Sequence, residues 1–174
     1  MTNERPGTAT TWVVASASLL YLIAGCIGTA VAVDAGLPAA FLGIRTGLSP
    51  LQDWFAMGTA LSPPFIFMLV QLGLTLALAT RGAWRGRALR WLTVLAAMEF
   101  LGMLGEPITY DVLPPGPREG TYAVLVVTFL VLPLVILVVG GREWRRAAAP
   151  SSRAQTAAAA APPPVDGMSP DPPA

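Results

Sequence analysis

The chain has 174 residues, of which 54% are hydrophobic and only 12% are charged. Soluble domains usually carry about 25% charged residues, so this composition indicates a membrane protein. All eleven basic residues are arginines, histidine is absent, and Cys26 is the single cysteine. We therefore expect no cofactor, no metal site and no disulfide, and the net charge of +1 argues against a nucleic-acid partner.

Four apolar runs predict membrane-spanning helices in an all-α bundle. The first is free of charge over 22 residues, which at about 1.5 Å per residue covers about 33 Å. Ser62 is the predicted N-cap of the second, Pro133 is expected to kink the fourth, and a glycine pair is expected to end it. The predicted spans are 12–33, 63–80, 89–105 and 122–141.

The arginines predict the orientation of these spans. With four spans, nine arginines lie on the side of both termini, and only Arg45 and Arg118 lie on the other. The positive-inside rule therefore predicts a multi-pass protein of the plasma membrane, with a cytoplasmic N-terminus and a cytoplasmic C-terminus. Arginine without lysine, with abundant alanine, proline and glycine, favours a bacterium with a GC-rich genome. Residues 1–146 are expected to form the membrane domain, and the Ala/Pro-rich residues 147–174 a disordered tail.

The outer loop at 34–61 is too long and too apolar for a simple connector. Ser49 and Pro50 have the form of a helix start, and four apolar or small residues follow at helical spacing, with Gln52 and Asp53 on another face. We predict a short outer amphipathic helix that covers the bundle end. A re-entrant lid over a pocket is the alternative. The four residues are Leu51, Trp54, Phe55 and Gly58.

The first span also contains two cleavage-like motifs. Residues 23–26, Ile-Ala-Gly-Cys, resemble a bacterial lipobox, and residues 30–32 have the small-x-small form of an ordinary cleavage site. The apolar run continues past Cys26, and Glu4 cancels the charge of Arg5. These features favour an uncleaved helix, with lipidation of Cys26 or cleavage as alternatives.

Glu99 is the residue with the clearest functional implication, because it lies near the middle of the third span. A charged side chain there costs roughly 2.5–3.5 kcal/mol on insertion scales, so it usually faces the bundle or a wet cavity. Counting from the arginines places Gln71 at the same depth. We predict a midplane polar site in which Glu99 and Gln71 face each other, with Tyr21 as a weaker third member.

Further acids continue from this site toward the outer surface. Glu106 shares a helix face with Glu99, and Asp111 follows it, so these two define a predicted outer acidic face. A proton or cation path is one interpretation. A hydrogen-bonded interhelical clamp at Glu99 beneath a solvated acidic rim is the other, and is slightly favoured.

Two predicted surfaces concern partners beyond the surrounding lipid bilayer. The small residues Ala24, Gly28 and Ala32 repeat every four positions and predict close packing within the bundle, with a homodimer as the sharper alternative. Arg142, Arg145 and Arg146 are candidates for binding anionic lipid, or are simple topology anchors.

These observations favour a non-enzymatic accessory or scaffolding membrane protein. The alternative is a small carrier or ligand-binding protein that uses Glu99 and Gln71 for a proton, a cation or an amphiphile. We expect no catalytic residues, since histidine is absent and no nucleophile–base pair is evident in the sequence.

Overall fold

The computed structural model describes residues 7–42, 44–80, 82, 84–111 and 120–148. These form an almost entirely helical protein with one short hairpin, so the all-α prediction is confirmed. The sequence analysis did not predict the hairpin. The elements in order are α1 (Thr8–Asp34), β1 (Ala40–Phe41), β2 (Ile44–Arg45), α2 (Pro50–Ala56), α3 (Phe65–Ala79), α4 (Trp84–Gly105), α5 (Ile108–Asp111) and α6 (Gly120–Ala148).

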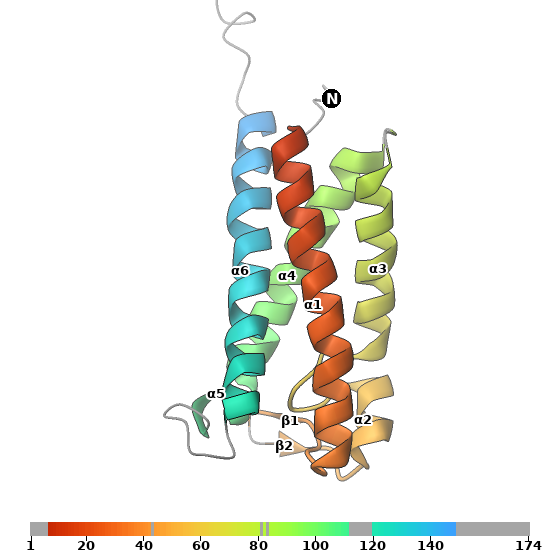
Figure 1. The fold of residues 1–174 in the computed structure, drawn as a ribbon, viewed down its shortest axis with the longest axis vertical. Coiled ribbons are helices and arrows are strands. Elements are labelled where there is room, and N and C mark those ends of the chain that lie inside the picture. The colour runs from red at the N-terminus through yellow and green to blue at the C-terminus, as the bar shows by residue number, and fades with distance from the viewer. Residues whose placement is uncertain (1–6, 43, 81, 83, 112–119, 149–174) are drawn as a thin grey trace, which may run out of the picture.

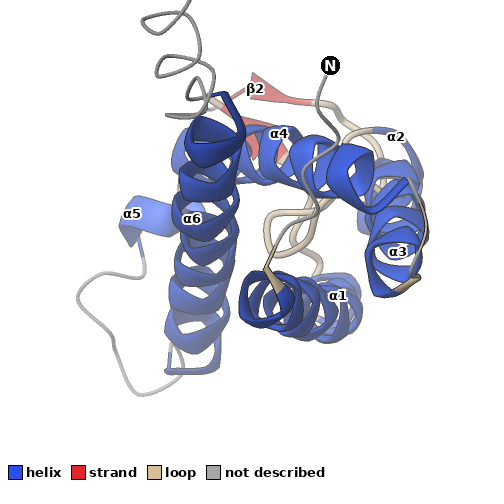
Figure 2. Cartoon of the chain, turned by 90° about the horizontal axis from the view of Figure 1, so that it is seen from above, coloured by secondary structure: helices blue, strands red, loops and turns tan. Residues whose placement is uncertain are grey.

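Four helices form a closed ring. Helix α1 packs on α3 and α6, and α4 packs on the same two neighbours from the opposite side. The view along the bundle shows α4 lying across the space between α3 and α6 (Figure 2). In Figure 1, α2, α5 and the hairpin gather at one end, and the start of α1 and the end of α6 meet at the other. We call these the capped end and the arginine-rich end.

The outward surface of the bundle is apolar along its length. Helices α1, α4 and α6 are long and apolar enough to cross a bilayer, and α3 is a shorter apolar helix of 15 residues. All four helices expose large aliphatic side chains, for example Ile23, Leu69, Leu101 and Val131. Soluble proteins rarely expose so much contiguous apolar surface, whereas such a surface is stable in hydrocarbon, so the fold is that of a membrane protein.

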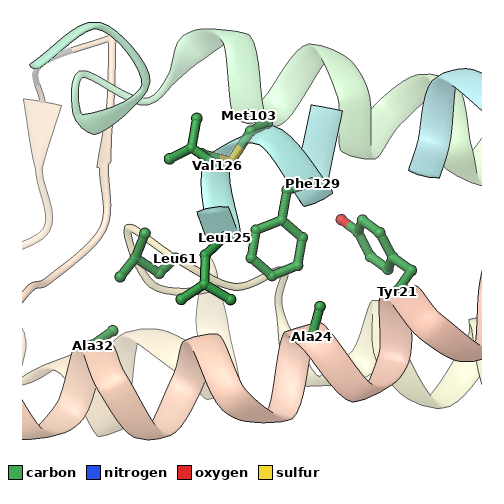
Figure 3. Close-up of a cluster of buried hydrophobic side chains, with 8 residues drawn as sticks. All are labelled: Tyr21, Ala24, Ala32, Leu61, Met103, Leu125, Val126 and Phe129. Carbon is green, nitrogen blue, oxygen red and sulfur yellow. The ribbon is translucent and has the colours of Figure 1, made fainter. Parts of the chain in front are cut away.

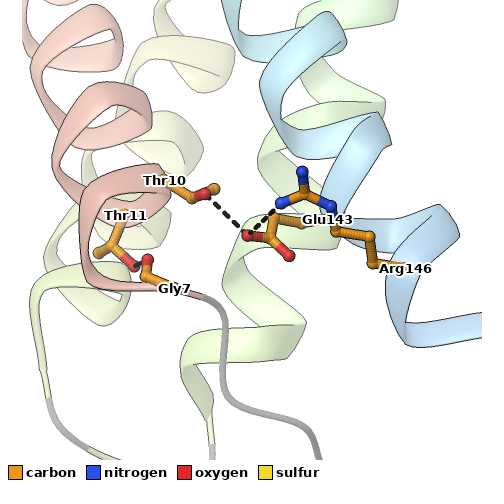
Figure 4. A network of polar contacts seen from close by, with 5 residues as sticks. All are labelled: Gly7, Thr10, Thr11, Glu143 and Arg146. Atoms are coloured by element: carbon orange, nitrogen blue, oxygen red, sulfur yellow. Dashed lines mark hydrogen bonds and ion pairs between the residues drawn. The ribbon is translucent and has the colours of Figure 1, made fainter. Parts of the chain in front are cut away.

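The arginine-rich end is tied together by polar contacts between the first and last helices (Figure 4). The Thr10 hydroxyl donates to Glu143 Oε1 at 2.8 Å, and an Arg146 nitrogen lies 3.6 Å from the same oxygen. Arg87 lies over the ring of Trp84 at 4.9 Å. Exposed Trp12, Trp84, Trp91 and Trp144 lie toward this end of their helices, as interfacial tryptophans commonly do.

Asp53 of α2 holds the capped end together. The sequence predicted that the apolar face of this helix packs on the bundle, but here the acid is buried and apolar residues are exposed. Helix α2 begins with the predicted capping box, in which Ser49 and Gln52 bond each other's backbone N–H. Asp53, however, is fully buried: its carboxylate accepts from the Ala39 N–H at 3.1 Å and from the Thr46 hydroxyl. The apolar residues Leu51 and Phe55 are exposed instead. The short polar side chain points inward because the preceding loop supplies its donors, one from the backbone and one from the Thr46 hydroxyl.

Two predicted helix ends are wrong. Helix α3 starts at Phe65 with Pro64 at its N-cap, because the Ser62 hydroxyl is engaged with Thr29 and Thr59 at 2.9 and 2.8 Å. Helix α6 runs through the glycine pair to Ala148, since Gly140 serves a close approach to α4 and not a helix stop. It also continues through Pro133. Of the predicted disordered tail, residues 149–174 lie outside the described residues.

Candidate functional site

A cavity of about 180 Å³ lies among the four bundle helices, in the half nearer the capped end. Each of the four bundle helices contributes to its wall, with Tyr21 from α1, Phe67 from α3, Glu99 from α4 and Phe129 from α6. The hairpin and residues 57–64, which we call the covering segment, lie over this cavity. Exposed lining residues in the hairpin, directly after α2 and on the flank of α4 show that the cavity is open to its surroundings; they are Ile44, Met57 and Met98.

An apolar cluster borders this cavity (Figure 3). The Tyr21 ring stands edge-on to Phe129 with ring centroids 5.2 Å apart, and its hydroxyl points away from α1. Leu61, Met103 and Val126 pack in the same cluster. The side chains around the cavity are therefore fixed by close packing, which gives it a defined shape.

Glu99 is the most unusual residue in this cavity. Its side chain is 6% exposed, it lines the cavity, and neither carboxyl oxygen has a hydrogen-bond partner within the described part of the chain. Buried polar groups are almost always hydrogen-bonded, and each exception calls for a reason. Gln71 Oε1 is also without a partner among the described residues, but of these two residues only Glu99 lines the cavity, which makes Glu99 the candidate for receiving a ligand.

The other two predicted members of the midplane site are also buried, but they play different parts. Tyr21 lines the cavity with Glu99. Gln71 is 1% exposed and is not in the cavity lining, and no hydrogen bond among the described residues joins it to Glu99. Gln71 belongs instead to a chain in which its backbone carbonyl accepts from Thr75, whose hydroxyl lies 2.7 Å from that of Ser18. The Glu99–Gln71 pairing stays a prediction.

Below Glu99, toward the arginine-rich end, the interior is filled by a second apolar cluster. Val14, Leu78, Leu92 and Ile136 come from the four different helices and are almost completely buried. The cavity therefore occupies one half of the bundle, and packed side chains occupy the other.

Glu106 lies near the capped end of the same cavity, one residue beyond α4. Its carboxylate oxygens accept from the Ala40 N–H at 3.2 and 3.4 Å. Burial raises the pKa of Glu106 above its usual range, and the nearby charge of Asp53 adds to this, while the Ala40 bond opposes it. Two of the outer acids, Asp53 and Glu106, are thus turned into the structure and do not belong to a solvated rim, whereas Asp34 at the end of α1 is exposed. The side chain of Asp111, at the end of α5, is outside the described part.

Replacing Glu106 with glutamine should change how stability depends on pH. With its pKa raised in the folded state, Glu106 binds its proton more tightly there than in the unfolded chain. Its contribution to stability is therefore present at low pH and is lost as pH rises from the usual glutamate range through the raised pKa. The melting temperature in detergent should fall across weakly acidic pH, and less so for Glu106→Gln. Glu99 and Asp53 remain in both proteins, so parallel curves would contradict the assignment.

The covering segment before α3 is a part of the site that sequence reasoning missed. Thr59 and Ser62 line the cavity and pair through backbone and side chain, and Thr29 of α1 joins them. Gly28 allows this contact: a Cβ there would lie 1.9 Å from the Leu61 carbonyl oxygen. The small-residue stripe of α1 was correctly predicted to pack within the chain, but at Gly28 the closest partner is this segment, with the Phe129 ring of α6 beside it at 3.3 Å. Small residues spaced four apart predict that another part of the chain packs closely on this helix face, but they do not predict which part.

Comparisons with known proteins give no functional information about this cavity. No protein-family model matches this chain, and neither does any curated protein or solved structure. Among the described residues, no group of three or more acidic or cysteine side chains could hold a metal ion. What remains is a mostly apolar cavity with two carboxyl groups and a phenol, an arrangement typical of small-molecule sites.

Proposed function

We propose that this protein binds a small, mostly apolar ligand with one polar group, received in the cavity around Glu99. The observation that carries the proposal is that Glu99 lines an open cavity while both of its buried carboxyl oxygens lack a partner among the described residues. An accessory or scaffolding role, which the sequence favours, ranks second here. A structural clamp would be expected to leave Glu99 hydrogen-bonded to a neighbouring helix. That the protein is not an enzyme stays an expectation.

Four crossings of the plasma membrane best explain the arrangement. Helices α1 and α4 both run from the arginine-rich end to the capped end (Figure 1), so the chain must return between them, and α3 is the helix that does so. Its 15 residues extend about 22 Å. That is short for a bilayer, but local thinning accommodates such a mismatch at modest cost. By the positive-inside rule the arginine-rich end is cytoplasmic, and the cavity opens toward the outer half of the membrane.

This topology can be tested with single cysteines in a chain carrying Cys26→Ser. Leu48 is exposed beside the hairpin and Trp144 is exposed near the end of α6. A membrane-impermeant maleimide added to intact cells should label Leu48→Cys directly and Trp144→Cys only after permeabilisation. The reverse pattern, or equal labelling of both, would overturn the topology.

The ligand-binding role also requires that α1 be retained. Tyr21 lines the cavity, and Ala24 and Gly25 pack inside the bundle, so loss of the residues before Cys26 would open one wall. We therefore favour an uncleaved first helix. Intact mass of the purified protein distinguishes this from cleavage before Cys26 or after Ala32.

A substitution that fills the cavity tests the proposal. Gly102 of α4 lines the cavity, and a Cβ there would meet no atom within 4 Å, so leucine can extend into the open space. Gly73 of α3 offers equal room but lies outside the lining, which makes Gly73→Leu the matched control. Engineered cavities of about 150 Å³ hold benzene, so benzyl alcohol and benzylamine are suitable probes.

We expect wild type and Gly73→Leu in phosphatidylcholine nanodiscs to retain at least one of these probes in equilibrium dialysis, beyond what empty nanodiscs retain. Gly102→Leu should lose this retention while keeping its melting temperature. Failure of the wild type to retain either probe, or retention by Gly102→Leu equal to wild type, would refute ligand binding in this cavity.

A further inference from the structure

The charge around the cavity is one-sided. Glu99 and Glu106 both line it, and no arginine is among the lining residues that the structure describes. Asp53 adds a third acid close to Glu106. Arg45 lies between two lining residues of the hairpin, Ile44 and Thr46, but is itself exposed and, by strand alternation, on the opposite side. The cavity therefore attracts cations and repels anions.

The vacant groups match the donors of an ammonium ion. Glu99 offers two carboxyl oxygens without partners among the described residues, and Tyr21 lines the same cavity. A neutral alcohol has a single donor and would satisfy one of these acceptors. An alkylammonium group has three N–H donors and could satisfy both carboxyl oxygens and the phenol oxygen together. Each bond would also be charge-assisted.

The remaining wall suits an organic cation better than a metal ion. Hard cations require several oxygen ligands, whereas much of this wall is thioether and aromatic carbon. Met98 and Met103 can adapt to the shape of a ligand, and the rings of Tyr21 and Phe129 can interact with a cation over their faces. A ligand of about one ring with a short amine-bearing arm fits a cavity of about 180 Å³.

We propose that the ligand is a small primary amine in its ammonium form, with its N–H groups on Glu99 and its apolar body against the methionine and aromatic wall. This inference rests on the proposed function and specifies the chemistry of the ligand. A buried ammonium and a buried carboxylate are each costly alone in a membrane interior, and pairing offsets much of that cost.

Three probes of one shape and different charge test the inference: benzylamine, benzyl alcohol and benzoate. Each is dialysed against wild-type protein in zwitterionic phosphatidylcholine nanodiscs, with empty nanodiscs subtracted. We expect benzylamine to bind about ten- to a hundredfold more tightly than benzyl alcohol, in line with hydrogen bonds to charged groups, and benzoate not to be retained. Glu99→Gln should reduce the preference to near equality. Asp34→Asn, which removes an exposed acid outside the cavity lining, should leave the preference unchanged.

The outcomes separate this inference from the proposed function. Equal binding of benzylamine and benzyl alcohol to the wild type, blocked for both by Gly102→Leu, overturns the ammonium inference and leaves the ligand-binding proposal standing. A preference that survives in Glu99→Gln places the ammonium elsewhere and overturns it too. Should Glu99→Gln fail to fold, the ratio of the two affinities in the wild type still decides. Retention of neither probe overturns both proposals.

Discussion

Replacing Glu99 with methionine is expected to stabilise the protein while abolishing its binding of benzylamine. Methionine has a similar length and fills the same space without polar atoms. Because two buried carboxyl oxygens lack partners among the described residues, their removal should raise the free energy of unfolding by about 1–3 kcal/mol. The measurement is the melting temperature in detergent, read together with retention of benzylamine in nanodiscs.

Asp53 provides the matched control for this experiment. It is also a buried acid, but its carboxylate accepts from the Ala39 N–H and the Thr46 hydroxyl. Asp53→Ala should therefore lower stability by about 1–3 kcal/mol, since it leaves the Ala39 donor unsatisfied. Opposite signs at the two acids would support a site at Glu99. A fall in melting temperature for Glu99→Met as large as that for Asp53→Ala would identify Glu99 as a structural clamp.

Gly28→Ala is expected to be the most destabilising of the small substitutions in α1. The added methyl group would lie 1.9 Å from the Leu61 carbonyl oxygen, so the covering segment or the helix must move. Overpacking of this kind costs about 1–3 kcal/mol and sometimes more. Movement of this segment should also separate Ser62 from Thr29 and disturb the cavity wall, so binding of benzylamine should weaken together with thermal stability.

Alanine substitutions at two further glycines provide controls for the loss of stability expected at Gly28. At Gly25 a new Cβ would meet the end of the flexible Met68 side chain at 2.9 Å, so Gly25→Ala should be mild. At Gly73 it would meet nothing within 4 Å, and alanine is the better helix former by about 1 kcal/mol, so Gly73→Ala should be neutral or slightly stabilising. If Gly28→Ala melts at the same temperature as Gly73→Ala, the close approach to Leu61 does not exist in solution.

The helices were predictable because their signals are local. A long uncharged run can only be satisfied in lipid by a helix, and the capping box at Ser49 and Gln52 involves residues three apart. The burial of Glu99 also followed from local sequence, since a lone acid within an apolar run has to avoid hydrocarbon.

The cavity and its cover were not predictable in the same way, because they depend on contacts between distant residues. Depth along a helix can be counted from the arginines, which predicts one level for Gln71 and Glu99, and both side chains are buried. The direction in which a side chain points depends on the rotation of each helix about its axis, which counting does not give. The burial of Asp53 depends likewise on a loop that folds back to supply the Ala39 N–H.

The packed cluster below Glu99 bears on what the protein does to the membrane that holds it. Leu78, Leu92 and Ile136, with Val14, close the interior of the described bundle at that level with almost completely buried apolar side chains. Liposomes containing the protein should therefore sustain a proton gradient as well as empty ones do. A guest could be held in the capped half of the bundle without discharging the energy stored across the bilayer.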